Sequence, residues 1–105
     1  MKKGDIIQVR FPFTNQQGSK LRPALVLAVE APDVTVAFIT GNASLGKPHD
    51  IVLQPTALNR LSKPSLVRVL KIATLDPSQL QGHIGELTAV ELQQVNDGLR
   101  LGLQL

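Results

Sequence analysis

The stretch Leu21-Arg22-Pro23-Ala24-Leu25-Val26-Leu27-Ala28-Val29 decides how this sequence folds. Its segment 24–29 is the longest wholly apolar run in the chain. Six residues suit a buried β-strand and fall far short of the ~20 that a membrane span needs. Proline is tolerated at the first residue of a strand, where its missing N–H falls at the edge of the ladder. The sequence therefore predicts a central strand from Pro23 to Val29.

Further strands are predicted on both sides of this one. Residues 5–13 alternate between apolar and polar side chains, with Ile6 as the exception, which is typical of a half-buried strand. Polar segments predict loops at 14–20 and 41–48, and a tight connection at 31–33. The side chains expected on the buried face of the first strand are Ile7, Val9, Phe11 and Phe13. The remaining strands are expected at 34–40, 50–53 and 66–72.

The last third of the chain changes to the period of a helix. Asp76-Pro77 is typical of a helix start, and Gly82 predicts the end of that short helix. Thr88-Ala89-Val90-Glu91 fits a capping box, and an apolar stripe at helical spacing follows it. The stripe consists of Leu92, Val95, Leu99 and Leu103. We expect a mainly β (α+β) fold: five short strands in a small, strongly curved antiparallel sheet or barrel, with short helices and a C-terminal helix.

Composition limits the classes of protein that this chain can represent. It has 105 residues, which predicts a single domain over 1–105, and its 43% hydrophobic and 18% charged residues are typical of globular proteins. The absence of cysteine excludes a disulfide framework, a zinc knuckle, a thiolate nucleophile and an iron–sulfur cluster. The start, Met1-Lys2-Lys3-Gly4-Asp5, has no apolar segment behind its charges. We therefore expect no signal peptide and a cytoplasmic location.

The net charge of +3 conceals alternating bands. Segments 1–29 and 59–75 each carry a net charge of +4, whereas 30–58 and 76–105 carry −2 and −3. Two cationic bands that converge in a compact domain would attract a polyanion, although ordinary solvated charges explain the composition equally well. The chain has three Phe and no Trp or Tyr, so an RNA or DNA partner would be held by phosphate and polar contacts more than by stacking.

Motifs of common catalytic and metal sites are missing from the sequence. His49 and His83 are isolated, and neither belongs to a spacing that binds metal. There is no nucleophile elbow, Walker motif or dinucleotide glycine pattern. Lys20 and Arg22 stand where a polar loop meets a buried strand, which suits a phosphate as well as a surface ion pair. Thr40 ends a strand, where its hydroxyl could also hydrogen-bond its own turn.

At these positions the sequence resembles the PemK/MazF family of toxin endoribonucleases. The resemblance covers nearly the whole chain in the order and spacing of the family, and the motifs are specific only in combination. It rests chiefly on Gly4-Asp5-Ile6-Ile7, Gly18-Ser19-Lys20-Leu21-Arg22-Pro23-Ala24-Leu25-Val26-Leu27, Ala37-Phe38-Ile39-Thr40 and Lys71-Ile72-Ala73-Thr74-Leu75-Asp76.

The resemblance implies a compact SH3-like barrel that works as a homodimer in the cytoplasm. It also implies cleavage of single-stranded RNA without metal or another cofactor, and neutralisation by a cognate antitoxin. Arg22 and Thr40 match the catalytic positions of the family. The implied RNA contacts are Asn15, Gln17, Ser19, Lys20, Asn42 and Lys71.

The chain departs from the family at three places. The loop before Arg22 lacks the acidic or longer glycine-rich stretch of many relatives, so base specificity does not transfer. Ala73 stands where many relatives carry arginine, and Gly41-Asn42 where relatives often carry serine and glutamine. The alternative is a catalytically inactive member that binds RNA or an antitoxin without cutting. The related gyrase-poisoning toxins share the fold, but this chain lacks their C-terminal aromatic residues.

Overall fold

The computed structural model describes residues 1–12, 19–42, 44 and 46–105, with the backbone alone at Phe11, Pro12 and Ser19. Phe13 and the predicted loop at 14–18 lie outside the described residues. None of the described helices has the length and apolar character needed to cross a bilayer. The elements are β1 (Asp5–Pro12), β2 (Ser19–Glu30), β3 (Asp33–Thr40), β4 (Ile51–Leu53), β5 (Ser65–Leu75), the 3-10 turn η2 (Pro77–Gln79), β6 (Leu80–Glu86) and α1 (Ala89–Leu103).

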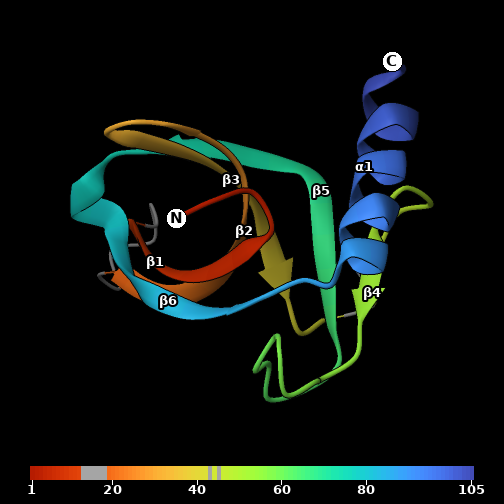
Figure 1. Ribbon diagram of the computed structural model, residues 1–105, viewed down its shortest axis with the longest axis horizontal. Coiled ribbons are helices and arrows are strands. Elements are labelled where there is room, and N and C mark those ends of the chain that lie inside the picture. Colours follow the sequence, from red (N-terminus) through yellow and green to blue (C-terminus); the bar gives the residue numbers. More distant parts are fainter. Residues whose placement is uncertain (13–18, 43, 45) are drawn as a thin grey trace.

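The strands form one antiparallel sheet in the order β4-β5-β3-β2-β1-β6. Figure 1 shows that this sheet is strongly curved, with α1 lying beside β4 and β5. Within the described strands the order has two edges, β4 and β6, so the expected curvature is confirmed and closure into a barrel is not. The expectation of five strands is wrong, because β6 is a sixth.

The central strands are buried on both faces. Successive side chains of a strand point to opposite faces, yet Ile6 and Ile7 are both buried. The prediction of a half-buried first strand is confirmed, because Ile7 and Val9 are buried and Arg10 is exposed, and its exception, Ile6, belongs to a second core on the other face. One cluster consists of Ile6, Leu25, Ala37, Ile39, Leu53, Val67, Val69, Leu87 and Val95. The other consists of Ile7, Val9, Ala24, Val26, Val34, Val36 and Leu75.

Strand β2 begins at Ser19, so the prediction that Pro23 opens the strand is wrong. Pro23 lies opposite Gln8 of β1, and the described pairing with β3 starts only at Ala24. Pro23 is thus one residue outside the β2–β3 ladder, where the missing N–H costs least. Ser19 and Lys20 belong to the strand and not to the predicted loop.

The other predicted strands are confirmed with small shifts in their ends. Those expected at 34–40 and 50–53 are β3 and β4, and the one expected at 66–72 is the longer β5. The helix start predicted at Asp76-Pro77 is confirmed, but the end predicted at Gly82 is wrong. Asp76 caps a single 3-10 turn, and Gly82 lies within β6. Gly82 faces Gln8 at an irregularity of the β1–β6 register, a position where strands often carry glycine.

The C-terminal helix begins as predicted. Thr88 Oγ1 accepts a hydrogen bond from the Glu91 N–H at 3.1 Å, and the Glu91 carboxylate accepts one from the Thr88 N–H at 2.9 Å. Val95 is fully buried, and Leu92 and Leu99 are half-buried, as the stripe predicts. Leu103 is 48% exposed, because the last turn of α1 extends beyond the sheet (Figure 1).

Close packing explains a glycine that helix propensity disfavours. A Cβ on Gly98 would lie 2.4 Å from the backbone carbonyl oxygen of His49. A Cβ on Gly102 would meet only the Leu70 side chain, at 3.1 Å. Because Gly98 has no side chain, α1 can approach the backbone of His49, in the segment that precedes β4 along the chain.

We predict that Gly98→Ala destabilises the protein by about 1–3 kcal/mol, because the backbone of His49 must move. Helix propensity alone predicts the opposite sign, a gain of about 1 kcal/mol. Urea unfolding followed by circular dichroism measures the difference. Gly102→Ala is the matched control and should cost less, since the Leu70 side chain can rotate. A Gly98→Ala protein more stable than wild type would contradict the close approach.

Candidate active site at the β2–β3 strand end

The register of β2 and β3 brings Arg22 and Thr40 to the same end of the sheet. The last described pair is Ala24 opposite Phe38, and Arg22 and Thr40 follow two residues further along their strands. Side chains two residues apart share a face, so both residues lie on the face of Ala24 and Phe38. Opposite residues of an antiparallel pair have Cα atoms about 4.5–5.5 Å apart. Continuation of this register by two residues would set Arg22 opposite Thr40.

A rigid apolar base supports this strand end. Ala24 is fully buried, and the half-buried Phe38 packs against the same core cluster. Arg22 is exposed and Thr40 is half-buried, so both can meet a ligand from solvent. Side chains that stand on strands over a packed core are positioned more precisely than side chains on loops.

The turn after β3 holds Thr40 and Asn42 together. Thr40 Oγ1 accepts a hydrogen bond from the Asn42 N–H at 3.2 Å. Asn42 Oδ1 in turn accepts from the N–H of Ser44 at 3.1 Å and from its hydroxyl at 2.6 Å. A threonine hydroxyl that accepts one hydrogen bond still has its own O–H to donate. The bond to the turn is therefore compatible with a second role for Thr40.

The structure separates the predicted RNA contacts. Lys20 is exposed on β2, two residues from Arg22, and Asn42 is exposed beside Thr40. Lys71 is exposed on β5, five residues beyond Leu66, which is the residue that faces Thr40. It thus lies away from the strand end, in the irregular part of the β3–β5 register. Asn15 and Gln17 lie outside the described residues, as does the side chain of Ser19.

Sequence reasoning missed Lys63, which the fold brings to the same turn. Its side chain lies where a side chain of Gly41 would be, next to Thr40. No spacing in the sequence predicts this contact, because it depends on the pairing of β3 with β5. Ser65 Oγ donates to the Lys63 carbonyl oxygen at 2.9 Å, just before β5 begins.

Asp50 neutralises one of the predicted cations. Its buried carboxylate forms an ion pair with Arg68 Nε at 3.0 Å and accepts hydrogen bonds from the N–H groups of Val69 and Lys47 at 3.0 and 2.9 Å. Arg68 faces Phe38 in the β3–β5 register. This ion pair fastens the segment before β4 to the middle of the sheet, so Arg68 has a structural partner.

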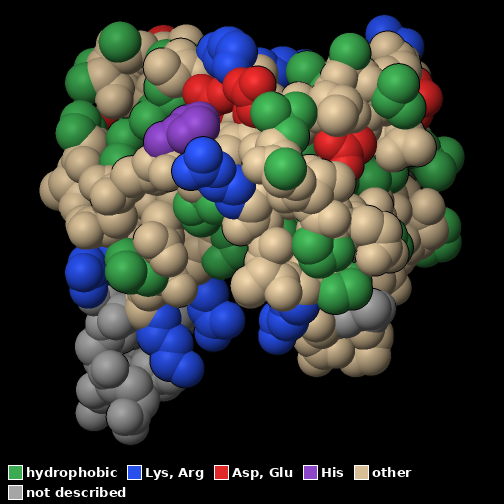
Figure 2. All heavy atoms as spheres, turned by 60° about the horizontal axis from the view of Figure 1, so that its bottom comes forward, with side chains coloured by type: hydrophobic (Ala, Val, Ile, Leu, Met, Phe, Trp, Pro, Cys, Tyr) green, Lys and Arg blue, Asp and Glu red, His purple; other side chains and the backbone are tan. Residues whose placement is uncertain are grey.

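The remaining basic side chains are unevenly distributed over the surface. Figure 2 shows several Lys and Arg side chains along the lower edge of the drawn face, and others at its centre and along its upper edge. The acidic side chains of the same face lie mainly toward the opposite edge (Figure 2). The lower edge, where Figure 2 shows basic and no acidic side chains, suits an anionic ligand.

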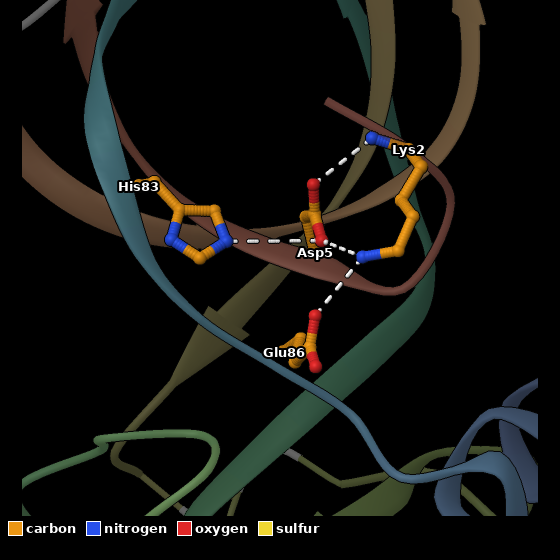
Figure 3. A network of polar contacts seen from close by, with 4 residues as sticks. All are labelled: Lys2, Asp5, His83 and Glu86. Carbon is orange, nitrogen blue, oxygen red and sulfur yellow. Dashed lines mark hydrogen bonds and ion pairs between the residues drawn. The ribbon is translucent and has the colours of Figure 1, made fainter.

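A second polar cluster joins the N-terminus to β6 and is shown in Figure 3. Lys2 Nζ lies 2.9 Å from both Asp5 Oδ1 and Glu86 Oε2, and the Lys2 N–H donates to Asp5 Oδ2 at 2.9 Å. His83 Nε2 lies 3.7 Å from Asp5 Oδ1. Asp5 is only 4% exposed. Its carboxylate oxygens are thus occupied by partners of the same chain, which marks a structural network.

Burial raises the pKa of Asp5, but the hydrogen bonds from the side chain and backbone of Lys2, with the charges of Lys2 and His83, outweigh it. The net result is a pKa of Asp5 below its ordinary value. Hydrogen bonds to Asp5 and Glu86 raise the pKa of Lys2.

Within the described residues, no group of three or more His, Asp or Glu side chains is arranged to hold a metal ion.

The chain is similar to known toxin sequences. The sequence model of the PemK-like, MazF-like toxins of type II toxin–antitoxin systems matches residues 2–103. The chain is 34% identical over 100 residues to the endoribonuclease MazF6 of Mycobacterium tuberculosis, which covers 90% of this chain and 88% of the relative. It is 26% identical over 116 residues to the endoribonuclease MazF9 of the same organism, covering 100% and 98%.

Solved structures share the fold. The toxin MazF-mt6 of Mycobacterium tuberculosis superposes with a TM-score of 0.79 at 25% identity, covering 96% of this chain and 97% of the other. A MazE–MazF crystal structure from Deinococcus radiodurans gives a TM-score of 0.77 at 26% identity, covering 100% and 97%. A mycobacterial endoribonuclease solved with its cognate antitoxin, at 20% identity and a TM-score of 0.75 over 100% and 96%, shows likeness of fold alone.

We predict that acid weakens the fold through the network around Asp5. Because the folded-state pKa of Asp5 is lowered, its contribution is present above the unfolded pKa of about 3.9 and is lost as pH falls through the folded pKa. Asp5→Asn should cost roughly 1–3 kcal/mol near pH 7 and much less in acid. Urea unfolding across this pH range measures both, with the exposed Glu30→Gln as control. A cost for Asp5→Asn that does not change with pH would contradict the assignment.

Proposed function

Because this chain belongs to the PemK-like, MazF-like toxin family of type II toxin–antitoxin systems, we propose that it is a sequence-selective endoribonuclease that cuts single-stranded mRNA without a metal ion. The observation that supports this proposal is that Arg22 and Thr40 lie at the same end of β2 and β3, each two residues from the paired Ala24 and Phe38. These are the two residues that the family resemblance implicates. Relatives named as endoribonucleases, 34% and 26% identical, support the same activity.

RNA contains its own nucleophile, the 2′-hydroxyl group. In the proposed reaction the 2′-oxygen forms a bond to the adjacent phosphorus while the bond from phosphorus to the 5′-oxygen breaks. The 2′-hydroxyl loses its proton, and the leaving 5′-oxygen gains one. The products are a 2′,3′-cyclic phosphate and a 5′-hydroxyl. Charge grows on the non-bridging oxygens as the fifth bond forms, and a protein accelerates the step by stabilising that charge.

Arg22 supplies this stabilisation in the proposed mechanism. Its planar guanidinium group can donate two parallel hydrogen bonds to phosphate oxygens. Its place two residues beyond the buried Ala24 fixes the origin of the side chain. Thr40 is half-buried at the same strand end, and in the proposed mechanism its hydroxyl donates a hydrogen bond to the 2′-oxygen or to a phosphate oxygen, which orients the reacting groups.

We propose that a cognate antitoxin neutralises the protein. Relatives have been solved as a MazE–MazF assembly and as an endoribonuclease with its antitoxin. The basic side chains along the lower edge in Figure 2 favour an acidic, amphipathic segment as the inhibitor, because complementary charge guides association. As the resemblance implies, the protein would work in the cytoplasm as a homodimer, with residues 1–105 as one toxin domain.

The second candidate function is binding of RNA or antitoxin without cleavage. Two residues favour it: Gly41 and Ala73 stand where relatives often carry polar or charged side chains. Both functions predict affinity for RNA, and only the first predicts new RNA ends.

We predict that the purified protein cuts unstructured RNA in EDTA and that Arg22→Ala lowers the cleavage rate by about 10²–10³, the loss typical of a missing charge-stabilising donor. Thr40→Val keeps the branched shape and should slow cleavage for want of the hydroxyl. Arg100→Ala, on the exposed face of α1, is the matched control. Sequencing of 5′ ends gives the sites, and mass spectrometry should find a 2′,3′-cyclic phosphate.

The outcomes distinguish the two functions and test the proposed mechanism. No cleavage by wild type or variant favours the binding protein, and equal cleavage by wild type and Arg22→Ala removes Arg22 from the mechanism. A 3′-hydroxyl with a 5′-phosphate would exclude attack by the 2′-oxygen.

A further inference from the structure

Lys63 occupies the space beside Gly41. A Cβ built on Gly41 would lie 2.1 Å from Lys63 Cε and 2.7 Å from Nζ, distances at which the lysine would have to move. The absence of a side chain at 41 therefore lets the lysine lie across the turn that follows Thr40. The ammonium group, at the end of this stem, is held close to the residue after Thr40.

The sheet order places this cation opposite Arg22. Strand β3 lies between β2 and β5, and its last residue, Thr40, faces Leu66 at the start of β5. Lys63 precedes that start by two residues, whereas Arg22 comes from β2 on the other side. The Thr40–Gly41 segment is thus approached by one cationic side chain from each neighbouring strand.

The positive charge of Lys63 is not neutralised by a described acidic side chain. Lys2 pairs with Asp5 and Glu86, and Arg68 pairs with the buried Asp50. Among the described residues, by contrast, no carboxylate forms an ion pair with Lys63 Nζ. Lys63 is exposed, so a phosphate can reach it from solvent.

We propose that Lys63 is a further RNA-binding residue of this site and that its ammonium group binds a phosphate oxygen of the RNA strand that lies across Thr40. The inference rests on the proposed cleavage of RNA. An ammonium group acts as a point charge without the fixed geometry of arginine. Its role is therefore to bind the RNA strand in the ground state, while Arg22 stabilises the negative charge that develops on the phosphate during the reaction. Gly41 provides the space in which the lysine lies.

Two variants test this role by different routes. Lys63→Met keeps an unbranched side chain on Gly41 and removes the charge. Gly41→Ala keeps the charge and displaces the ammonium group. Because Gly41 meets only the flexible end of a side chain, neither change should alter the unfolding temperature by more than a few degrees. Lys3→Met is the matched control. Lys3 is an exposed lysine just before the start of β1, whereas Arg22 pairs with Val9 in the second half of that strand.

In steady-state cleavage, Lys63→Met should raise KM about tenfold and leave kcat within about twofold, as expected for a contact made equally in the ground and transition states. Gly41→Ala should raise KM in the same direction. RNA binding is measured separately with a fluorescent single-stranded RNA and the non-cleaving Arg22→Ala background. There, the slope of log K against log salt should fall by about 0.7 on adding Lys63→Met. Lys3→Met should leave both KM and the slope unchanged.

Failure of this inference can be told apart from failure of the proposed function. If the wild-type protein does not cut RNA, the proposed function fails, and the salt slope still reports whether Lys63 contacts phosphate. If wild type cuts and Arg22→Ala does not, while Lys63→Met changes neither KM nor the salt slope, the inference about Lys63 is overturned alone. A fall in kcat with unchanged KM would likewise overturn the assigned role in binding.

Discussion

The burial of both faces of β1, β2 and β3 is the constraint on which the structure depends. Ile6 and Ile7 enter different clusters, as do Leu25 and Val26. A slip of one residue would move every side chain to the other face, so a strand with two different buried faces fixes its register. That register also brings Arg22 and Thr40 to the same end of the sheet. The geometry of the candidate site is therefore a consequence of core packing some distance from it.

Close backbone contacts fasten the outer elements to this sheet. Asn59 is fully buried, and its amide group bonds the backbone of Thr56, Leu61 and Gln54 at 2.8–3.0 Å. The Leu58 carbonyl oxygen accepts from the Glu86 N–H at 3.1 Å, and a Cβ on Gly85 would lie 2.5 Å from that oxygen. The segment before β5 is thereby tied to the end of β6, and its buried polar groups are satisfied by each other.

Some elements were predictable from local sequence patterns, whereas others depend on pairing between strands that are far apart in the sequence. Alternation and β-branched residues indicated β3, β4 and β5, and the capping box at Thr88 gave the start of α1. Strand β6 could not be predicted, because Leu80-Gln81-Gly82-His83-Ile84-Gly85-Glu86 has little apolar alternation and extends through pairing with β1. Spacing left the roles of Arg22 and Thr40 open, and the family resemblance selected them. Lys63 was hidden, since its contact with Gly41 joins residues that only the β3–β5 ladder brings together.

The same distinction applies to charge. A net charge of +3 counts every cation alike, whereas the fold assigns Lys2 and Arg68 to carboxylates of their own chain. The field that a polyanion meets is set by the basic side chains left exposed without such partners, and at the strand end these include Lys63. An acidic inhibitor that covers this strand end would compete with RNA phosphates for the same charges. Under the proposed function, inhibition then needs no change of shape in the sheet, because occupation of the cationic side chains is sufficient to exclude the substrate.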